Sequence, residues 1–538
     1  MSQQTIIPGF VAALALAALS YTALAPAAND AVDPSGGGAY SNDAFRTEVV
    51  QVARACAAGR RGDHVEEDEP SLGQAGPWEA SVAVYADGVR THEGSAAAMG
   101  LDAALCDAVT QALGATPKSP LSEQARLLIT LRPDGGDLHS IIEFEGRGLE
   151  LVGDLVPLRT LTRRDVRRAV EANKDYLLRI MHPELHGFSK KYDVARGGFD
   201  DRLRTIYSSS SLYSLLRVNT LEVDPRVEAN IEPIADFILS MQKQDEPYRG
   251  AFHYSYNLTT SEKERRFPVG TTAKVIMTLA ALYEGDQDPR YLQAAIAAGD
   301  WLLSLQTPDG GFPVDVAWRR GAWDTNEAFS LFYNCQVLTG LSRLYAISEA
   351  PRHLDGARRL AGKLLGMVEE QGPLLRDQYR RKVESISTSW LAMALLDYSR
   401  IDPASGSLEV AFKNLDALLP LQMTDPSDIA NYGRFSDTRA TSGNGWINEV
   451  VSELLVACEA TGRPDCERLE RALILTTRWL IQNTYSPQNT YHIEDPERVI
   501  GGLIRNAREE SVRTDAVCHG VNSLVGLLQS TQREALLH

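Results

Sequence analysis

The chain lacks the features that mark several common classes of protein. It has 538 residues and a formal net charge of -17, and no stripe of Lys and Arg interleaved with aromatic residues runs along it. An acidic chain without such a stripe is a poor candidate for a nucleic-acid-binding protein. The 6 cysteines include no Cys-x-x-Cys pair, and the serine run at 208–211 stands in no Gly-x-Ser-x-Gly motif. We therefore expect no nucleic-acid partner, no metal, no cofactor and no serine nucleophile.

Long apolar runs are also scarce, and the N-terminus alone has one that could cross a membrane. Residues 6–25 are mostly apolar and end in small residues, which is typical of a secretory signal. No Lys or Arg precedes this run, so a retained membrane anchor is the alternative. We expect export to a periplasmic or extracellular place, with residues 1–28 as the signal peptide or anchor and residues 29–44 as a linker.

Two cysteines flank a predicted turn between helices. Cys458 and Cys466 begin and end the segment CEATGRPDC. In an oxidising compartment they could form a disulfide between the two helix ends, whereas in a reducing one they would be two unpaired thiols. Both alternatives stay open at the level of the sequence.

Residues 45–158 have the pattern of a small α/β module. Helical patterns at 45–58 and 96–113 accompany three strand-like segments, WEASVAVYADG, ARLLITLRP and LHSIIEFEGRGLELVG. An Asp-Gly-Gly turn at 134–136 separates the last two segments. No chemistry stands out in this module, but it could dock an envelope partner.

Beyond residue 160 the chain reads as a helical repeat, and we expect no further strands. A polar residue ends an apolar-rich helix six times, at successive steps of 60, 64, 65, 51 and 60 residues. Each such helix is amphipathic and alternates with a second helix that is small or apolar on nearly every face, which indicates burial all round. The six ending residues are His182, Gln242, Gln306, Gln371, Gln422 and Gln482.

This repeat predicts a mainly α fold in which residues 160–532 form an (α/α)6 toroid of six helix hairpins. An open solenoid is the alternative, but it would need polar capping repeats, which the sequence does not show. The links from inner to outer helices are short, and those from outer to inner helices run to roughly 13 to 30 residues, a length that usually carries function. The inner helices should then begin at one rim, where their N–H groups favour an anionic or hydroxyl-rich ligand.

The long links are rich in aromatic side chains and guanidinium groups. Aromatic faces stack on sugar rings, and arginine forks bind carboxylates through two hydrogen bonds, although each aromatic could equally cap the core. Asp324 could instead cap the third inner helix, with Glu327 completing a capping box. The candidate substrate-binding residues are Arg204, His253, Tyr256, Arg266, Trp318, Trp323, Asp324, Tyr432, Arg434, Trp446, His492 and Arg513.

Three candidate catalytic residues lie near the starts of the last two inner helices. His519 follows Asp515 by four residues, so the two share a helix face and could act as a carboxylate-oriented acid and base. Glu449 is a charged residue in an otherwise apolar helix and therefore needs a reason to be there. With Asp324 or Asp515 it could cleave a glycosidic bond.

Two tyrosines complete the candidate catalytic set. Tyr207 or Tyr254 could exchange protons with His519 while neighbouring arginines hold a substrate carboxylate. This arrangement would suit an epimerase or a lyase, whereas the paired carboxylates would suit a hydrolase. The arginines best placed for that task are Arg204, Arg266 and Arg513.

The repeat architecture and the segments GAFHYSYN and TPDGGFP give residues 165–530 a family resemblance. They resemble the (α/α)6-toroid enzymes that act on carbohydrates, namely uronyl epimerases, toroid polysaccharide lyases and six-hairpin glycosidases, and in particular the glucuronyl epimerase C-terminal domain. The resemblance implies an exported epimerase, lyase or glycoside hydrolase acting on a saccharide, with uronic acid as the expected sugar. No catalytic signature matches residue by residue, and a non-catalytic envelope binding or assembly protein is the alternative.

Overall fold

The computed structural model describes residues 43–537 apart from 60–73, 87–88, 115–125, 134–138, 145–146, 150–157, 159, 195, 380–382, 427–430, 488, 491–492, 494 and 507–508. The expected signal or anchor at 1–28 lies outside the described residues, as does nearly all of the expected linker at 29–44. In the described part of the chain, no helix has the length and apolarity needed to cross a membrane.

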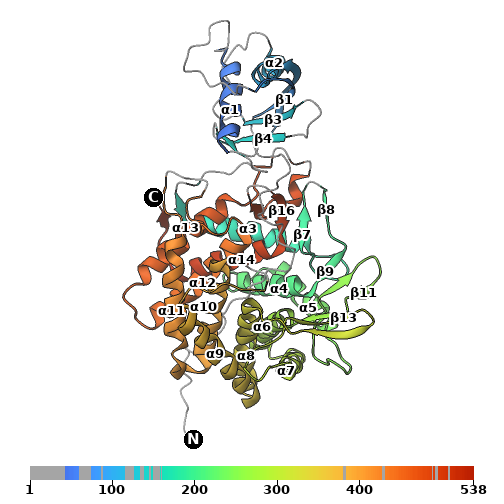
Figure 1. Cartoon of the computed structure of the whole chain (residues 1–538), viewed down its shortest axis with the longest axis vertical. Helices are drawn as coiled ribbons and strands as arrows, with labels where there is room; N and C mark the ends of the chain where they lie inside the picture. Colours follow the sequence, from blue (N-terminus) through green and yellow to red (C-terminus); the bar gives the residue numbers. More distant parts are fainter. Residues whose placement is uncertain are drawn as a thin grey trace.

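The N-terminal elements build a five-stranded antiparallel sheet in the order β2-β1-β3-β4-β5, with two helices packed on it (Figure 1). This part has its own hydrophobic core, and a disulfide between Cys56 and Cys106 joins its helices. The expected helix at 96–113 begins only at residue 101, because the preceding Gly-, Ser- and Ala-rich segment is a strand. The elements are α1 (Asp43–Ala57), β1 (Pro77–Ala86), β2 (Val89–Met99), α2 (Leu101–Leu113), β3 (Arg126–Pro133), β4 (His139–Phe144) and β5 (Arg147–Leu149).

Twelve of the remaining helices form six hairpins, as the repeat predicts. Each inner helix contacts the inner helices on both sides, and the last inner helix contacts the first, so the ring is closed. The (α/α)6 toroid is therefore confirmed. The inner helices are α4 (Thr205–Asn219), α6 (Val269–Asp286), α8 (Leu331–Ser348), α10 (Glu384–Ile401), α12 (Thr441–Ala460) and α14 (Thr514–Ser530). The outer helices are α3 (Arg163–Ile180), α5 (Pro225–Ser240), α7 (Pro289–Ser304), α9 (Pro351–Gln371), α11 (Ser407–Leu418) and α13 (Cys466–Gln482).

The outer helices begin with strong start signals after the short links. Proline occupies the first position of α5, α7 and α9, where its missing N–H costs nothing. Asp224 and Asp288 accept a hydrogen bond from the second helical N–H of α5 and α7, each at 2.8 Å. The short link between α12 and α13 is closed by a disulfide between Cys458 and Cys466.

The starts of all six inner helices are attached to the long link of the next hairpin. The N–H of Thr205, for example, donates to the carbonyl oxygen of Tyr254 at 3.2 Å. This ring of attachments places the six helix starts at one rim and uses some of the N–H groups that we expected to face a ligand. The other five bonds run from Val269 to Val314, Leu331 to Asp377, Ser385 to Asp437, Thr441 to Ile504 and Thr514 to Lys190.

The long links carry short strands, so the expectation of no strands beyond residue 160 is wrong. Three pairings join different links, namely β9 with β10, β12 with β13 and β7 with β16, whereas the others are hairpins within one link. Most of the strands are too short to show an alternating pattern. The rim sheets are β9 (Arg202–Arg204), β10 (Ser255–Asn257) and β11 (Glu262–Lys263); β12 (Arg266–Pro268), β13 (Asp315–Arg319) and β14 (Ala322–Asn326); and β7 (Lys191–Asp193), β8 (Gly198–Phe199), β15 (Ile504–Asn506) and β16 (Glu509–Arg513). A further pair joins β6 (Leu161–Thr162) to β17 (Ala535–Leu537), and short 3-10 turns lie at Pro403–Ser405, Leu419–Leu421 and Pro496–Arg498.

The proposed helix cap at Asp324 is also wrong. Asp324 lies in β14, and α8 begins only at Leu331 after the capping residue Ser330. Ser330, which the sequence reasoning did not consider, accepts a hydrogen bond from the N–H of Tyr333 and caps α8.

The repeated glutamine at the helix ends has a structural role. The side-chain amide of Gln242 donates to the carbonyl oxygen of Gly250 in its own link at 3.1 Å and to that of Ala294 in the next outer helix at 2.8 Å. Gly250 has a positive φ of 94° and lies so close to α7 that a Cβ atom would be 2.0 Å from the carbonyl oxygen of Ala297. The same arrangement recurs at Gln306 with Gly310 and Gly356, and at Gln422 with Gly433 and Ala472.

We expect Gly250→Ala to destabilise the toroid by about 3 kcal/mol or more, because the methyl group meets the backbone of α7 and the φ is unfavourable. Gly462→Ala is the matched control, since Gly462 has a φ of 65° and nothing within 4 Å of the added atom. It should cost only about 1 kcal/mol. Equal losses in chemical denaturation would show that the close approach of Gly250 to α7 does not matter.

Candidate functional site

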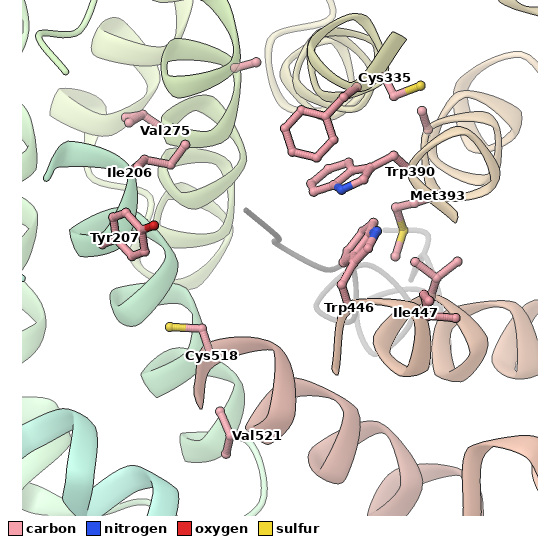
Figure 2. Close-up of a cluster of buried hydrophobic side chains, with 14 of the residues drawn as sticks. Ile206, Tyr207, Val275, Cys335, Trp390, Met393, Trp446, Ile447, Cys518 and Val521 are labelled. Carbon is pink, nitrogen blue, oxygen red and sulfur yellow. The ribbon is translucent and has the colours of Figure 1, made fainter. Parts of the chain in front are cut away.

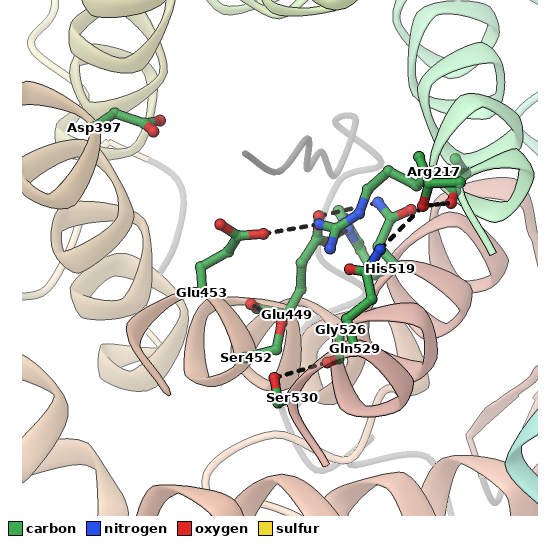
Figure 3. A network of polar contacts seen from close by, with 12 residues as sticks. Arg217, Asp397, Glu449, Ser452, Glu453, His519, Gly526, Gln529 and Ser530 are labelled. Atoms are coloured by element: carbon green, nitrogen blue, oxygen red, sulfur yellow. Dashed lines mark hydrogen bonds and ion pairs between the residues drawn. The ribbon is translucent and has the colours of Figure 1, made fainter. Parts of the chain in front are cut away.

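A buried carboxylate joins α12 to α14 inside the ring of inner helices. Glu449 accepts hydrogen bonds from Nδ1 of His519 and from the side-chain amide of Asn522, each at 2.9 Å (Figure 3). His519 and Glu449 are both 0% exposed. Gly445 permits the close approach of the two helices, because a Cβ atom there would lie 3.1 Å from the Cβ of His519. The carboxylate thus holds the imidazole ring in one orientation, the arrangement that acid–base catalysis by histidine requires.

Asp515 binds an arginine rather than standing beside His519 as its orienting partner. Arg513 donates from Nε and Nη2 to the two carboxylate oxygens of Asp515 at 2.9 and 2.7 Å. Its Nη2 also donates to the hydroxyl oxygen of Tyr207 at 3.1 Å, and all three side chains are buried. A two-point bond to a neighbouring guanidinium satisfies a buried carboxylate better than an imidazole four residues away. The partner that the structure gives to His519 is Glu449.

The ring of Tyr254 lies between two further guanidinium groups. The guanidinium carbons of Arg204 and Arg266 are 5.2 and 5.1 Å from the ring centroid. Burial raises the pKa of Tyr254, and the nearby positive charges only partly oppose this effect. The phenol therefore keeps its proton at neutral pH. Each of the three rim arginines is ion-paired: Arg204 with Asp200 at 3.1 Å, Arg266 with Asp315 at 2.6 Å and Arg513 with Asp515 at 2.7 Å.

Arg266 also lines an outer pocket of about 790 Å³ between the second, third and fourth long links. Trp318 is 42% exposed at this pocket, and the Arg265 guanidinium lies 5.6 Å from its ring centroid. Asp324 binds Arg319 at 3.0 Å on the pocket wall. The lining residues are Glu264, Arg265, Arg266, Asp315, Ala317, Trp318, Arg319, Asp324, Thr325, Asn326, Glu327 and Tyr379.

Trp390 and Lys274, which the sequence did not single out, extend the buried site around Trp446, which it did. Trp446 stacks on Trp390 with centroids 4.0 Å apart and lies 5.6 Å from the ring of His519 (Figure 2). The ammonium nitrogen of Lys274 lies 5.4 Å from the centroid of Trp390. Lys274 is a charged residue within an apolar helix, so the signal that found Glu449 would have found it too. We call Lys274, Trp390, Trp446, Glu449 and His519 the inner cluster.

Several expected binding residues have structural positions in the links. Arg434 donates to the carbonyl oxygens of Phe435, Ser436 and Thr438 and so braces its own loop. The ring of Tyr432 packs under a guanidinium of the outer helix α13, at 5.0 Å.

The remaining expected residues sit around the second and third links. His253 hydrogen-bonds through Nδ1 to the carbonyl oxygen of Glu264 at 2.8 Å, and Trp323 stacks on Phe267 with centroids 5.2 Å apart. Tyr256 belongs to β10 of the rim, and His492 lies outside the described residues.

The opposite end of the inner helices holds a buried ion network. Arg217 binds Glu453 at 2.9 Å (Figure 3), and Arg343 binds Asp397 at 3.1 Å. Arg400 contacts both carboxylates, at 3.4 Å for Glu453 and 2.8 Å for Asp397. Charges from α4, α8, α10 and α12 therefore meet near the helix ends that lie away from the rim. In the part of the chain that the structure describes, no group of three His, Cys, Asp or Glu side chains could hold a metal ion.

Comparisons with solved structures find the same toroid in enzymes that act on sugars. The cellobiose 2-epimerase of Bacillus thermoamylovorans B4167 is 12% identical, and the match covers 69% of this chain and 99% of that one with a TM-score of 0.53. A D-mannose isomerase matches with a TM-score of 0.52 at 12% identity over 68% and 99% of the two chains. An inactive α-1,6-mannanase variant of Salegentibacter sp. HEL1_6, in complex with α-1,6-mannotriose, has a TM-score of 0.50 at 12% identity over 68% and 100%.

These likenesses show the fold alone. No family model matches the sequence, and no curated protein matches it. The fold is the (α/α)6 toroid that the sequence resemblance implied.

We expect Asp515→Asn to destabilise the protein by about 3–5 kcal/mol, because it leaves the Arg513 guanidinium buried without its carboxylate. Asp324→Asn removes the carboxylate of an ion pair at the pocket wall and should change stability by about 1 kcal/mol or less. Denaturant unfolding of both variants measures the difference. Similar small effects would mean that the Arg513–Asp515 pair is not held in a desolvated place.

Proposed function

We propose that the protein is an exported enzyme that moves a proton on the carbon skeleton of a saccharide, as an epimerase or a lyase. The observation that carries the proposal is the buried hydrogen bond between His519 and Glu449, inside a rim lined by ion-paired arginines. A histidine held by a carboxylate can remove and return a proton near neutral pH, and such a group contributes about 10²–10⁴ to a rate.

Glycoside hydrolysis has weaker support from the geometry. It needs two carboxyl groups across the bond, one of them free to protonate the leaving oxygen. Asp515 is bound by Arg513 through two hydrogen bonds, and Asp324 is paired with Arg319 at the outer pocket. Neither carboxylate is free to act with Glu449 as an acid and a base.

In the proposed reaction His519 exchanges the proton and Glu449 fixes the orientation of its ring. Tyr207, held by Arg513, and the protonated Tyr254 are the candidate proton donors on the rim side. Arg204 and Arg266 are paired with Asp200 and Asp315, and would bind the carboxylate of a uronic acid through the guanidinium N–H groups that those pairs leave over.

Export is part of the same proposal. The apolar segment at 6–25 supports a signal peptide or an anchor, and the two disulfides suit an oxidising compartment. A non-catalytic envelope protein that binds a saccharide in the toroid is the second candidate, because the rim would bind such a ligand with or without turnover.

His519→Asn and Glu449→Gln should each lower turnover by about 10²–10⁴ while sugar binding is retained. His253→Asn is the matched control, since His253 hydrogen-bonds within its own link and is not part of the inner cluster. The assay follows epimerisation, bond cleavage and double-bond formation on cellobiose, mannose, mannotriose and glucuronate-containing oligosaccharides. Binding to any of these without turnover by the wild-type protein would favour the envelope binder instead.

The positive charge of Lys190 should make uronate binding depend on pH. Burial, followed by the nearby Arg513, lowers the pKa of Lys190 to about 8. The amine is therefore charged at pH 6.5 and neutral at pH 9.5, so the affinity for glucuronate should fall as the pH rises, by roughly fivefold for a loss of about 1 kcal/mol. Calorimetry at the two pH values tests this. Lys190→Met should bind glucuronate at pH 6.5 as weakly as the wild-type protein does at pH 9.5. If the variant binds glucuronate at pH 6.5 as tightly as the wild-type protein does, Lys190 does not contribute its charge to binding.

A further inference from the structure

Lys274 stands in the middle of the inner helix α6 and is 0% exposed. Its ammonium nitrogen has no hydrogen-bond partner among the residues that the structure describes. Lys174 is a second buried lysine, at 4% exposed, but its ammonium group is paired with Asp224 at 2.8 Å and also with Glu171. A buried amine without a partner is costly, so its place in an otherwise apolar helix needs a reason.

The surroundings of Lys274 are those of the inner cluster. Its nitrogen faces the Trp390 ring at 5.4 Å, Trp390 stacks on Trp446, and Trp446 lies against His519. Burial is the largest influence and lowers the pKa of Lys274 well below its ordinary value of 10.5. The charged or titratable groups that act on it are Glu449 of α12, Arg343 of α8, Cys518 of α14 and Asp397 of α10.

Desolvation favours the uncharged form of an amine, and an uncharged amine is a nucleophile toward carbonyl carbon. A reducing sugar in its open form presents an aldehyde, and the proposed acid–base group His519 belongs to the same inner cluster, on the other side of the stacked Trp390 and Trp446 rings. We propose that Lys274 forms an iminium with the aldehyde carbon of an open-chain reducing sugar bound in the inner cluster. This inference rests on the proposed function and narrows its substrate to sugars with a free reducing end.

The proposed step is balanced in atoms and electrons. The nitrogen lone pair of Lys274 forms a C–N bond to C1, and the carbonyl oxygen leaves as water with one proton from the His519 imidazolium and one from the amine. The neutral imidazole then removes the proton from C2, and the electron pair of that C–H bond forms C1=C2 while the C=N pair returns to nitrogen. Return of the proton to the other face of C2, followed by hydrolysis of the iminium by one water, releases the epimer and restores both side chains.

The test traps the iminium with a small probe, so it does not depend on knowing the sugar. The full-length protein is treated at pH 7 with glycolaldehyde and cyanoborohydride, and each lysine is then read by peptide mass spectrometry. We expect a hydroxyethyl group on Lys274 at least tenfold faster than on Lys174, which is buried but ion-paired. The exposed Lys413 reports that the reagents are active. An unmodified Lys274 in a sample where Lys413 is labelled would overturn the proposal.

Two variants separate this inference from the proposed function. His519→Asn should lose turnover but keep a labelled Lys274, whereas Lys274→Met should lose both turnover and the label at that position. Thermal unfolding checks that Lys274→Met still folds, which we expect because it replaces an unpartnered amine by an apolar side chain. Loss of turnover in His519→Asn without labelling of Lys274 in the wild-type protein would refute the iminium and leave the proposed function standing. Labelling of Lys274 in a wild-type protein that turns over no sugar would support the reactive amine and refute the proposed function.

Discussion

The ring of attachments between each inner helix and the next long link is the constraint on which the rest of the molecule depends. The first residue of α4 is bonded to the link before α6, and the pattern continues around to α14, whose start is bonded to the link before α4. Four of the six links are also held from outside, where a glycine lies against the backbone of the next outer helix; these glycines are Gly250, Gly310, Gly433 and Gly501. The rim is therefore fixed on both sides, and its arginines and tyrosines are positioned by the architecture rather than by a mobile loop.

The same attachments explain which parts of the fold could be predicted from the sequence. The period near 60 residues and the apolar inner helices were visible, because burial all round leaves a compositional trace. The rim strands were not visible, since most have only two or three residues and three of their pairings join different links. The late start of α8 was missed because Asp324 and Ser330 are both good capping residues, and only the pairing of β14 with β13 decides between them.

Some residues of the candidate site could likewise be predicted from the sequence, and others could not. Glu449 could be found because a carboxylate in an apolar helix needs a partner, and that partner is His519. The helix-face rule pointed from His519 to Asp515, but it took no account of Arg513, which reaches Asp515 from the end of β16. Contacts between neighbouring inner helices, such as that between Trp390 of α10 and Trp446 of α12, depend on how two hairpins pack, which the sequence does not show.

The ion network of Arg217, Arg343, Asp397, Arg400 and Glu453 has a consequence for the traffic of ligands. Because these ion-paired charges occupy the end of the ring away from the rim, the approach to the inner cluster lies on the rim side. A ligand that reached His519 would therefore enter and leave through one mouth.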